Sequence, residues 1–189
     1  MTLWIALGAL AYVAGSVNFA IILFRITGRE DPRRHHSKNP GATNVYRQAG
    51  FFWAAAVLSL DVGRAFLLGL AAVSWTDPAA AAWIGLALLL GNRYPCFHRF
   101  KGGKGVANYL GFTLALSPAA ALISGVAWLG TFFLFRVPFY ASFALVAVLA
   151  GGTLVRLGAH PATVAGVAAT VAFIAYNHRS NILEKLRTP

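Results

Sequence analysis

The sequence predicts an all-α, polytopic membrane protein with seven transmembrane helices, on three observations. Of its 189 residues 58% are hydrophobic and only 11% are charged, and the mean hydropathy of +0.65 is well above that of a soluble domain. Apolar runs recur along the whole chain, each near the roughly 20 residues that one crossing requires. Positive charge gathers between alternate runs. We expect a monomer with a single domain over residues 1–189.

Hydrophobic runs bounded by glycine, proline and charge define the seven helices. Their predicted ranges are 3–24, 51–74, 79–91, 105–116, 119–135, 139–155 and 161–177. Four of these helices are preceded by breaks with a proline suited to a first helical turn: Pro78, Pro118, Pro138 and Pro161. The first run is not a signal peptide, because its positive charges follow it at Arg25 and Arg29. It is predicted to be a retained helix with its amino terminus outside.

The basic residues predict the orientation of the helices. With the amino terminus outside, the cytoplasmic regions are 25–50, 92–104, the link at Arg136 and the tail after 177. These regions hold every lysine and arginine except Arg64, within the second helix, and Arg156, in an outside loop. Anionic lipid on the cytoplasmic side attracts such residues, so the net charge of +11 needs no nucleic-acid partner.

Three cytoplasmic segments are richer in special residues than orientation requires. The first is SKNPGATNV at 37–45, followed by Arg47, which has the composition of a tight, hydrogen-bonding loop. An ordinary turn into the second helix, capped by Thr43 or Asn44, explains it equally well.

The second segment is KGGKG at 101–105. Glycines let backbone amides approach an anion, the following helix offers its positive end, and lysine supplies a mobile charge. It is not a Walker P-loop, because Gly105 rather than serine or threonine follows Lys104. A flexible turn with two anchoring lysines is an equal alternative to a phosphate site.

The third segment is NHRSNI at 177–182, where His178 and Asn181 would share a face of a continuing helix. A histidine that simply ends a helix at the membrane interface is the alternative. All three segments are predicted on one side of the membrane, which favours a functional role.

The remaining special residues exclude several chemistries. Asp61 and Arg64 are predicted to pair within the second helix and to face the bundle, as a structural ion pair rather than a substrate contact. Without a cluster of carboxylates, a Mg²⁺-dependent phosphotransferase is disfavoured and no metal site is predicted. Cys96 is the only cysteine, so an intrachain disulfide is excluded. None of the five histidines begins an H-x-x-x-x-D motif, which excludes the acyltransferase mechanism built on it.

Taken in order, SKNPGATNVYR, the DVGR of the second helix, YPCFHRFKGGKGVA and HRSN resemble the bacterial glycerol-3-phosphate acyltransferases that use acyl phosphate as donor. The resemblance implies acyl transfer from acyl phosphate to the 1-hydroxyl of sn-glycerol 3-phosphate, giving lysophosphatidic acid and inorganic phosphate. This reaction opens phospholipid synthesis. It further implies a multi-pass protein of the bacterial inner membrane, with lipid around it, its active site and carboxyl terminus facing the cytoplasm, and no cofactor.

Carried onto this sequence, the resemblance gives as catalytic residues Ser37, Lys104, His178 and Asn181. It gives as binding residues Asn39, Gly41, Thr43, Asn44, Arg47, Lys101, Gly102, Gly103, Gly105 and Ser142. We expect the two lysines and the GGKG amides to hold phosphate and to offset charge at the acyl centre. Glycerol phosphate would be positioned by Ser37, Asn44, Arg47 and Asn181. His178 would either orient the acceptor or take its proton.

The chain departs from the family pattern at Asn92, where histidine is usual, at Phe139, where serine is usual, and at Arg64, where lysine is usual. A catalytically inactive membrane paralogue is therefore a second hypothesis. A small anion transporter is a third, because basic residues and glycine-broken helices can line a substrate path. The clustering of charge on one face, rather than at the midplane, argues against transport.

Overall fold

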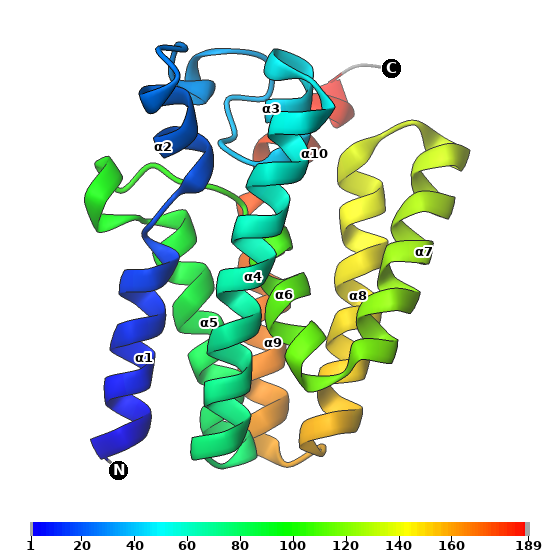
Figure 1. Ribbon diagram of the computed structural model, residues 1–189. Coiled ribbons are helices and arrows are strands. Elements are labelled where there is room, and N and C mark those ends of the chain that lie inside the picture. Colours follow the sequence, from blue (N-terminus) through cyan, green and yellow to red (C-terminus); the bar gives the residue numbers. More distant parts are fainter. Residues whose placement is uncertain (1, 188–189) are drawn as a thin grey trace.

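The structure is a computed structural model that describes residues 2–187, and helices make up most of it (Figure 1). The α-helices are α1 (Thr2–Gly15), α2 (Phe19–Ile26), α3 (Ala42–Ala49), α4 (Phe51–Trp75), α5 (Pro78–Arg93), α6 (Val106–Leu116), α7 (Pro118–Phe135), α8 (Pro138–Leu157), α9 (Pro161–Asn177) and α10 (Arg179–Arg187). Two short 3₁₀ turns are η1 (Pro32–Arg34) and η2 (Cys96–His98). Within residues 2–187, four segments are long and apolar enough to cross a membrane: Leu3–Ile26, Phe51–Trp75, Pro118–Phe135 and Pro138–Leu157.

Six of the seven predicted helices correspond to single observed helices, α4 to α9, with ends that agree to within two residues. All four prolines lie in the first helical turn, as predicted. Asp77 and Ser117 cap two of these helices, because their side-chain oxygens accept hydrogen bonds from the amides of Ala80 and Ala120.

The first predicted helix, 3–24, is wrong as a single helix, because the chain unwinds between α1 and α2. The side chain of Asn18 starts α2 by accepting a hydrogen bond from the Ile21 amide at 3.1 Å. The carbonyl of Val17, freed from the helix, accepts instead from the Arg64 guanidinium on α4. A distant arginine thus satisfies the backbone at the break.

The alternative in which Thr43 or Asn44 caps the second helix does not hold. Residues 42–49 form a helix of their own, α3, whose N-cap is Gly41. Gly50 then separates α3 from α4 with a φ of +86°, a left-handed conformation that glycine adopts without strain. The SKNPGATN segment therefore leads into a short helix above the membrane-length helix α4.

Small residues let the long helices approach one another closely. A methyl group on Gly91 of α5 would lie 2.0 Å from the Tyr12 carbonyl oxygen of α1, and one on Gly111 of α6 would lie 2.3 Å from that of Val62 on α4. Such contacts are typical of packing between helices in membranes, where lipid supplies no hydrophobic drive for association. The close pairs α1–α5 and α4–α6 form the frame on which the site is built.

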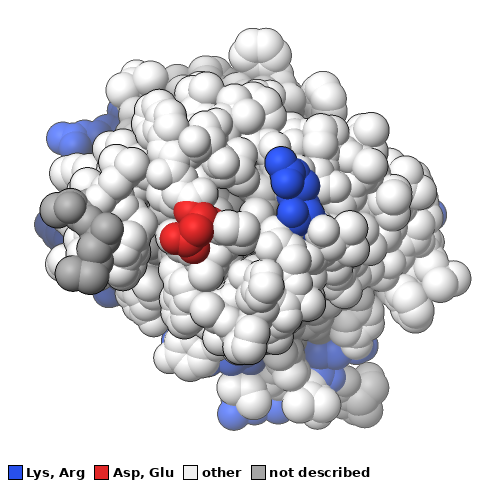
Figure 2. Space-filling view, turned by 90° about the horizontal axis from the view of Figure 1, so that it is seen from below, with Lys and Arg blue, Asp and Glu red and all other residues white. Residues whose placement is uncertain are grey.

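The two ends of the bundle differ in charge. Figure 1 places α2, α3 and α10 together at one end, and the amino terminus at the other. The first of these ends carries the basic residues of those helices, Arg25, Arg47, Arg179, Lys185 and Arg187. Figure 2, which views the opposite end, shows a surface with very little charge.

Candidate active site

A cavity of about 480 Å³ lies where the three sequence segments meet the membrane helices. The polar residues of its lining come mainly from the 37–47 segment, the loop before α6 and the start of α10. The apolar residues of its lining come mainly from α4, α6, α7 and α8. We call these two parts of the lining the polar and the apolar chamber.

All the predicted site residues except two line this cavity. Those that line it are Ser37, Asn39, Gly41, Thr43, Asn44, Arg47, Gly103, Lys104, Gly105, Ser142, His178 and Asn181. Lys101 and Gly102 do not. The Lys101 side chain is exposed, and its carbonyl oxygen instead accepts a hydrogen bond from Arg33 at 2.9 Å.

The expectation that all the GGKG amides hold phosphate is wrong for Gly102 and Gly103. Their N–H groups donate to the carbonyl oxygens of Arg93 (3.0 Å) and Asn92 (2.9 Å). A methyl group on Gly102 would lie 2.0 Å from the Asn92 carbonyl oxygen, so glycine is required for close approach to the end of α5. The N–H groups of these two glycines therefore fix the loop against the end of α5.

Lys104 is the cation that this loop presents to the cavity. Its ammonium group donates a hydrogen bond to the Oδ1 of Asn181, which joins the second segment to the third. Burial lowers the pKa of Lys104 to about 8, and the nearby charges of Arg93 and Arg47 add to the effect. Gly105, with a φ of +90°, then turns the chain into α6.

His178 follows the last residue of α9 and is buried. Its Nδ1 lies 2.8 Å from the Ile174 carbonyl oxygen, which can only accept, so Nδ1 carries the proton and Nε2 is free to accept. Burial, with a contribution from Lys104, lowers the pKa of His178 to about 4. The helix does not continue through this residue as predicted, yet His178 and Asn181 line the same cavity.

Several polar residues of the cavity were not among the predicted site residues: Asp61, Asn92 and Asn108. The predicted pair of Asp61 and Arg64 is present, with 2.9 Å between Oδ1 and the guanidinium, and the same guanidinium donates to Asn108 at 2.6 Å. Asn108 lies in the first turn of α6, directly after the KGGKG segment. That proximity to the predicted phosphate segment was the available signal for Asn108.

The apolar chamber was also not predicted residue by residue. It is lined by side chains from four helices, among them Leu58, Leu110, Trp128, Leu129, Phe139 and Leu145. Residues 2–187 contain no group of three or more His, Cys, Asp or Glu side chains placed to hold a metal ion. The side chains available to the site are a lysine, an arginine, a neutral histidine, hydroxyl groups, amides and the carboxylate of Asp61, which pairs with Arg64.

A model of the family described as glycerol-3-phosphate acyltransferase matches residues 5–188. The chain belongs to the glycerol-3-phosphate acyltransferase family. A glycerol-3-phosphate acyltransferase of Pseudomonas paraeruginosa is 40% identical over 179 residues, which cover 93% of this chain and 92% of the relative. The enzyme of Pseudomonas putida strain F1 is 39% identical over the same length.

Solved structures agree with this assignment. Crystal structures of PlsY (YgiH), an integral membrane glycerol 3-phosphate acyltransferase, are 36% identical to this acyltransferase. The glycerol 3-phosphate form gives a TM-score of 0.88 and the lysophosphatidic acid form 0.86; each match covers 97% of this chain, and 92% and 91% of those chains. The family and the enzyme class predicted from the ordered motifs are confirmed, as is an all-helical integral membrane protein.

The lowered pKa of Lys104 predicts an alkaline limit to acyl transfer. The lysine carries its charge below about pH 8 and loses it above, so kcat/KM should fall about tenfold for each pH unit above 8. The measurement is the initial rate with labelled glycerol 3-phosphate between pH 6 and 10. A Lys104→Arg variant stays charged, so its profile should be flat in this range. The same fall in that variant would assign the titration to another group.

Proposed function

We propose that this acyltransferase takes its acyl group from acyl phosphate and transfers it to the 1-hydroxyl of sn-glycerol 3-phosphate. The hydroxyl oxygen forms a bond to the acyl carbon, the bond from that carbon to the phosphate oxygen breaks, and the hydroxyl proton is released. The products are lysophosphatidic acid and inorganic phosphate. The reaction is the first step of phospholipid synthesis. The supporting observation is a single cavity with a cationic polar chamber beside an apolar one.

The polar chamber suits the phosphate groups of both substrates. Lys104 and Arg47 supply positive charge, with Ser37, Asn39 and Thr43 as hydrogen-bonding partners. Lys104 lines the same cavity as the apolar side chains, so its charge can also stabilise negative charge that develops on the acyl oxygen. The Nε2 of His178 accepts a hydrogen bond from the acceptor hydroxyl and orients it for attack.

The apolar chamber suits the acyl chain. Its walls come from α4, α6, α7 and α8, with Leu58, Leu110 and Trp128 among the side chains that face the cavity. Several neighbouring side chains on the outer surfaces of these helices are exposed and hydrophobic, as is typical of contact with lipid. A chain in this chamber would keep its acyl carbon beside Lys104.

We further propose a single-domain monomer that crosses the bacterial inner membrane seven times, and the charge distribution supports its orientation. The broken helix α1–α2 and helices α4 to α9 make the seven crossings. The basic end with α2, α3 and α10 faces the cytoplasm, and the nearly uncharged end of Figure 2 faces outward. This orientation puts the polar chamber, the active site and the carboxyl terminus on the cytoplasmic side.

The choice of donor is tested by supplying purified enzyme with labelled glycerol 3-phosphate and either palmitoyl phosphate or palmitoyl-CoA. We expect lysophosphatidic acid from palmitoyl phosphate, and a rate with palmitoyl-CoA lower by about a hundredfold or more, on the scale by which binding sites discriminate substrates. Lys104→Ala protein purified in parallel controls for contaminating acyltransferase. Product from palmitoyl-CoA alone would refute the proposed donor.

A further inference from the structure

Two loops bring the polar side chains of the cavity together. The first loop, residues 29–41, carries Ser37 and Asn39, and the second loop, residues 94–105, carries Lys104. They lie far apart in the sequence, so tertiary contacts must set their separation. A ligand phosphate held by both loops binds tightly only if that separation is fixed before it arrives.

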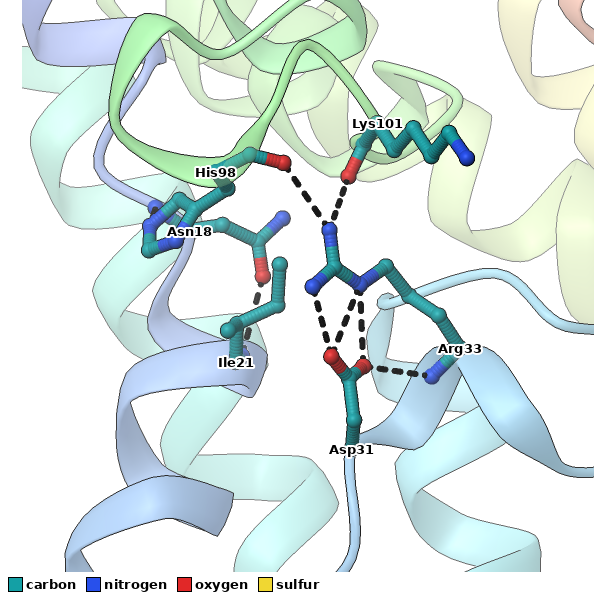
Figure 3. A network of polar contacts seen from close by, with 6 residues as sticks. All are labelled: Asn18, Ile21, Asp31, Arg33, His98 and Lys101. Atoms are coloured by element: carbon teal, nitrogen blue, oxygen red, sulfur yellow. Dashed lines mark hydrogen bonds and ion pairs between the residues drawn. The ribbon is translucent and has the colours of Figure 1, made fainter.

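Arg33 joins the two loops directly. Its guanidinium donates hydrogen bonds to the carbonyl oxygens of His98 (3.0 Å) and Lys101 (2.9 Å) in the second loop. On its other side it pairs with the carboxylate of Asp31, with Nε 2.9 Å from Oδ1 (Figure 3). The planar guanidinium can serve a carboxylate and two carbonyl groups at once, which a lysine ammonium cannot do with the same geometry.

The backbone that Arg33 holds is strained. Arg99 and Phe100, between the two bound carbonyl groups, have φ angles of 57° and 55°, a left-handed conformation unfavourable for residues other than glycine. Two such residues in succession persist only where surrounding contacts stabilise them. The hydrogen bonds from Arg33 lie immediately on either side of this strained pair.

Arg33 is itself fixed within the first loop. The Asp31 carboxylate also accepts a hydrogen bond from the Arg33 amide at 2.9 Å, which starts η1. From α3, the Asn44 side chain donates to the carbonyl oxygens of Pro32 (2.9 Å) and His35 (3.2 Å). The guanidinium therefore extends from η1, which these hydrogen bonds stabilise, to the strained turn of the second loop.

We propose that Arg33, oriented by Asp31, is a positioning residue that sets the distance between the two loops and so prepares the polar chamber for the substrate phosphate. It is not among the residues that line the cavity. The inference rests on the proposed function, because it assumes that a phosphate is bound between Lys104 and the first loop. Loss of Arg33 should weaken phosphate binding more than it slows the chemical step.

The test compares Arg33→Ala with Arg34→Ala. Arg34 is the adjacent residue, is exposed, and makes no side-chain hydrogen bond within residues 2–187, so its variant removes the same charge without opening the link. We expect Arg33→Ala to raise KM for glycerol 3-phosphate about tenfold, with kcat within about threefold of wild type, and Arg34→Ala to leave both within about twofold. Arg33→Lys should reverse only part of this increase in KM.

Binding is measured separately, as the shift in unfolding temperature that glycerol 3-phosphate alone produces in the purified protein. A smaller shift in Arg33→Ala than in Arg34→Ala supports the proposal, and no acyl donor is involved, so failure of the donor assignment would not affect this result. Equal shifts and equal KM values in the two variants would overturn it. A purely structural role would lower kcat and stability with KM unchanged. If Arg33→Ala does not fold, Arg33→Lys and Asp31→Asn are compared in the same way.

Discussion

Replacement of Lys104 by alanine should lower kcat/KM for acyl transfer by about a hundredfold to a thousandfold, the range for loss of one preorganised group that stabilises charge in a transition state. The reason is that Lys104 is the lysine of the GGKG loop that reaches the cavity, where burial strengthens its field. The measurement is lysophosphatidic acid formation from palmitoyl phosphate by purified variant in a lipid or detergent of fixed composition.

Lys101→Ala is the matched control, because it removes a lysine three residues away in the same loop. Its side chain is exposed and lies outside the cavity, and the hydrogen bond to Arg33 comes from its backbone carbonyl, which alanine retains. We expect activity within about threefold of wild type, as for an ordinary surface substitution. Wild-type turnover by Lys104→Ala, or equal losses in the two variants, would contradict the phosphate role assigned to Lys104.

The contrast between the two lysines shows what the motif alone can predict. Their sequence surroundings are nearly the same, so the pattern KGGKG predicted a phosphate site without separating them. The difference arises because Gly102 and Gly103 fold back onto the end of α5, which directs the loop so that only Lys104 enters the cavity. That contact depends on residues about ten positions earlier in the chain and has no local signature.

The fold was largely predictable because hydrophobic runs and prolines are local signals, and six helices followed them. The break between α1 and α2 was not, because Ser16, Val17 and Asn18 interrupt an apolar run only briefly. Their stabilising partners, Arg64 and the carbonyl group of Pro40, come from other parts of the chain. The residues of the apolar chamber were not predicted for a related reason. In the sequence, Leu58 and Trp128 cannot be told from lipid-facing residues, and only the packing of the helices shows that they line the cavity.

Replacement of His178 by alanine should lower kcat/KM by about a hundredfold, within the range for loss of a side chain that orients or deprotonates a reacting hydroxyl. The structure favours orientation, because a histidine with a pKa of about 4 is a weak base at neutral pH, while its Nε2 can still accept a hydrogen bond. His178→Gln retains an acceptor oxygen but cannot titrate near neutral pH. We therefore expect it to recover at least about tenfold over His178→Ala.

The pH dependence of the same variants separates the two roles. A group whose pKa is lowered to about 4 is neutral throughout pH 5–8, so protonation of His178 should impair acyl transfer only as the pH falls through about 4. Wild type and His178→Gln should then show parallel kcat/KM profiles between pH 5 and 8, since ionisation of the substrate affects both alike. An acid limb near pH 6.5 in wild type that is absent from His178→Gln would instead identify His178 as the general base, as would a glutamine variant no more active than alanine.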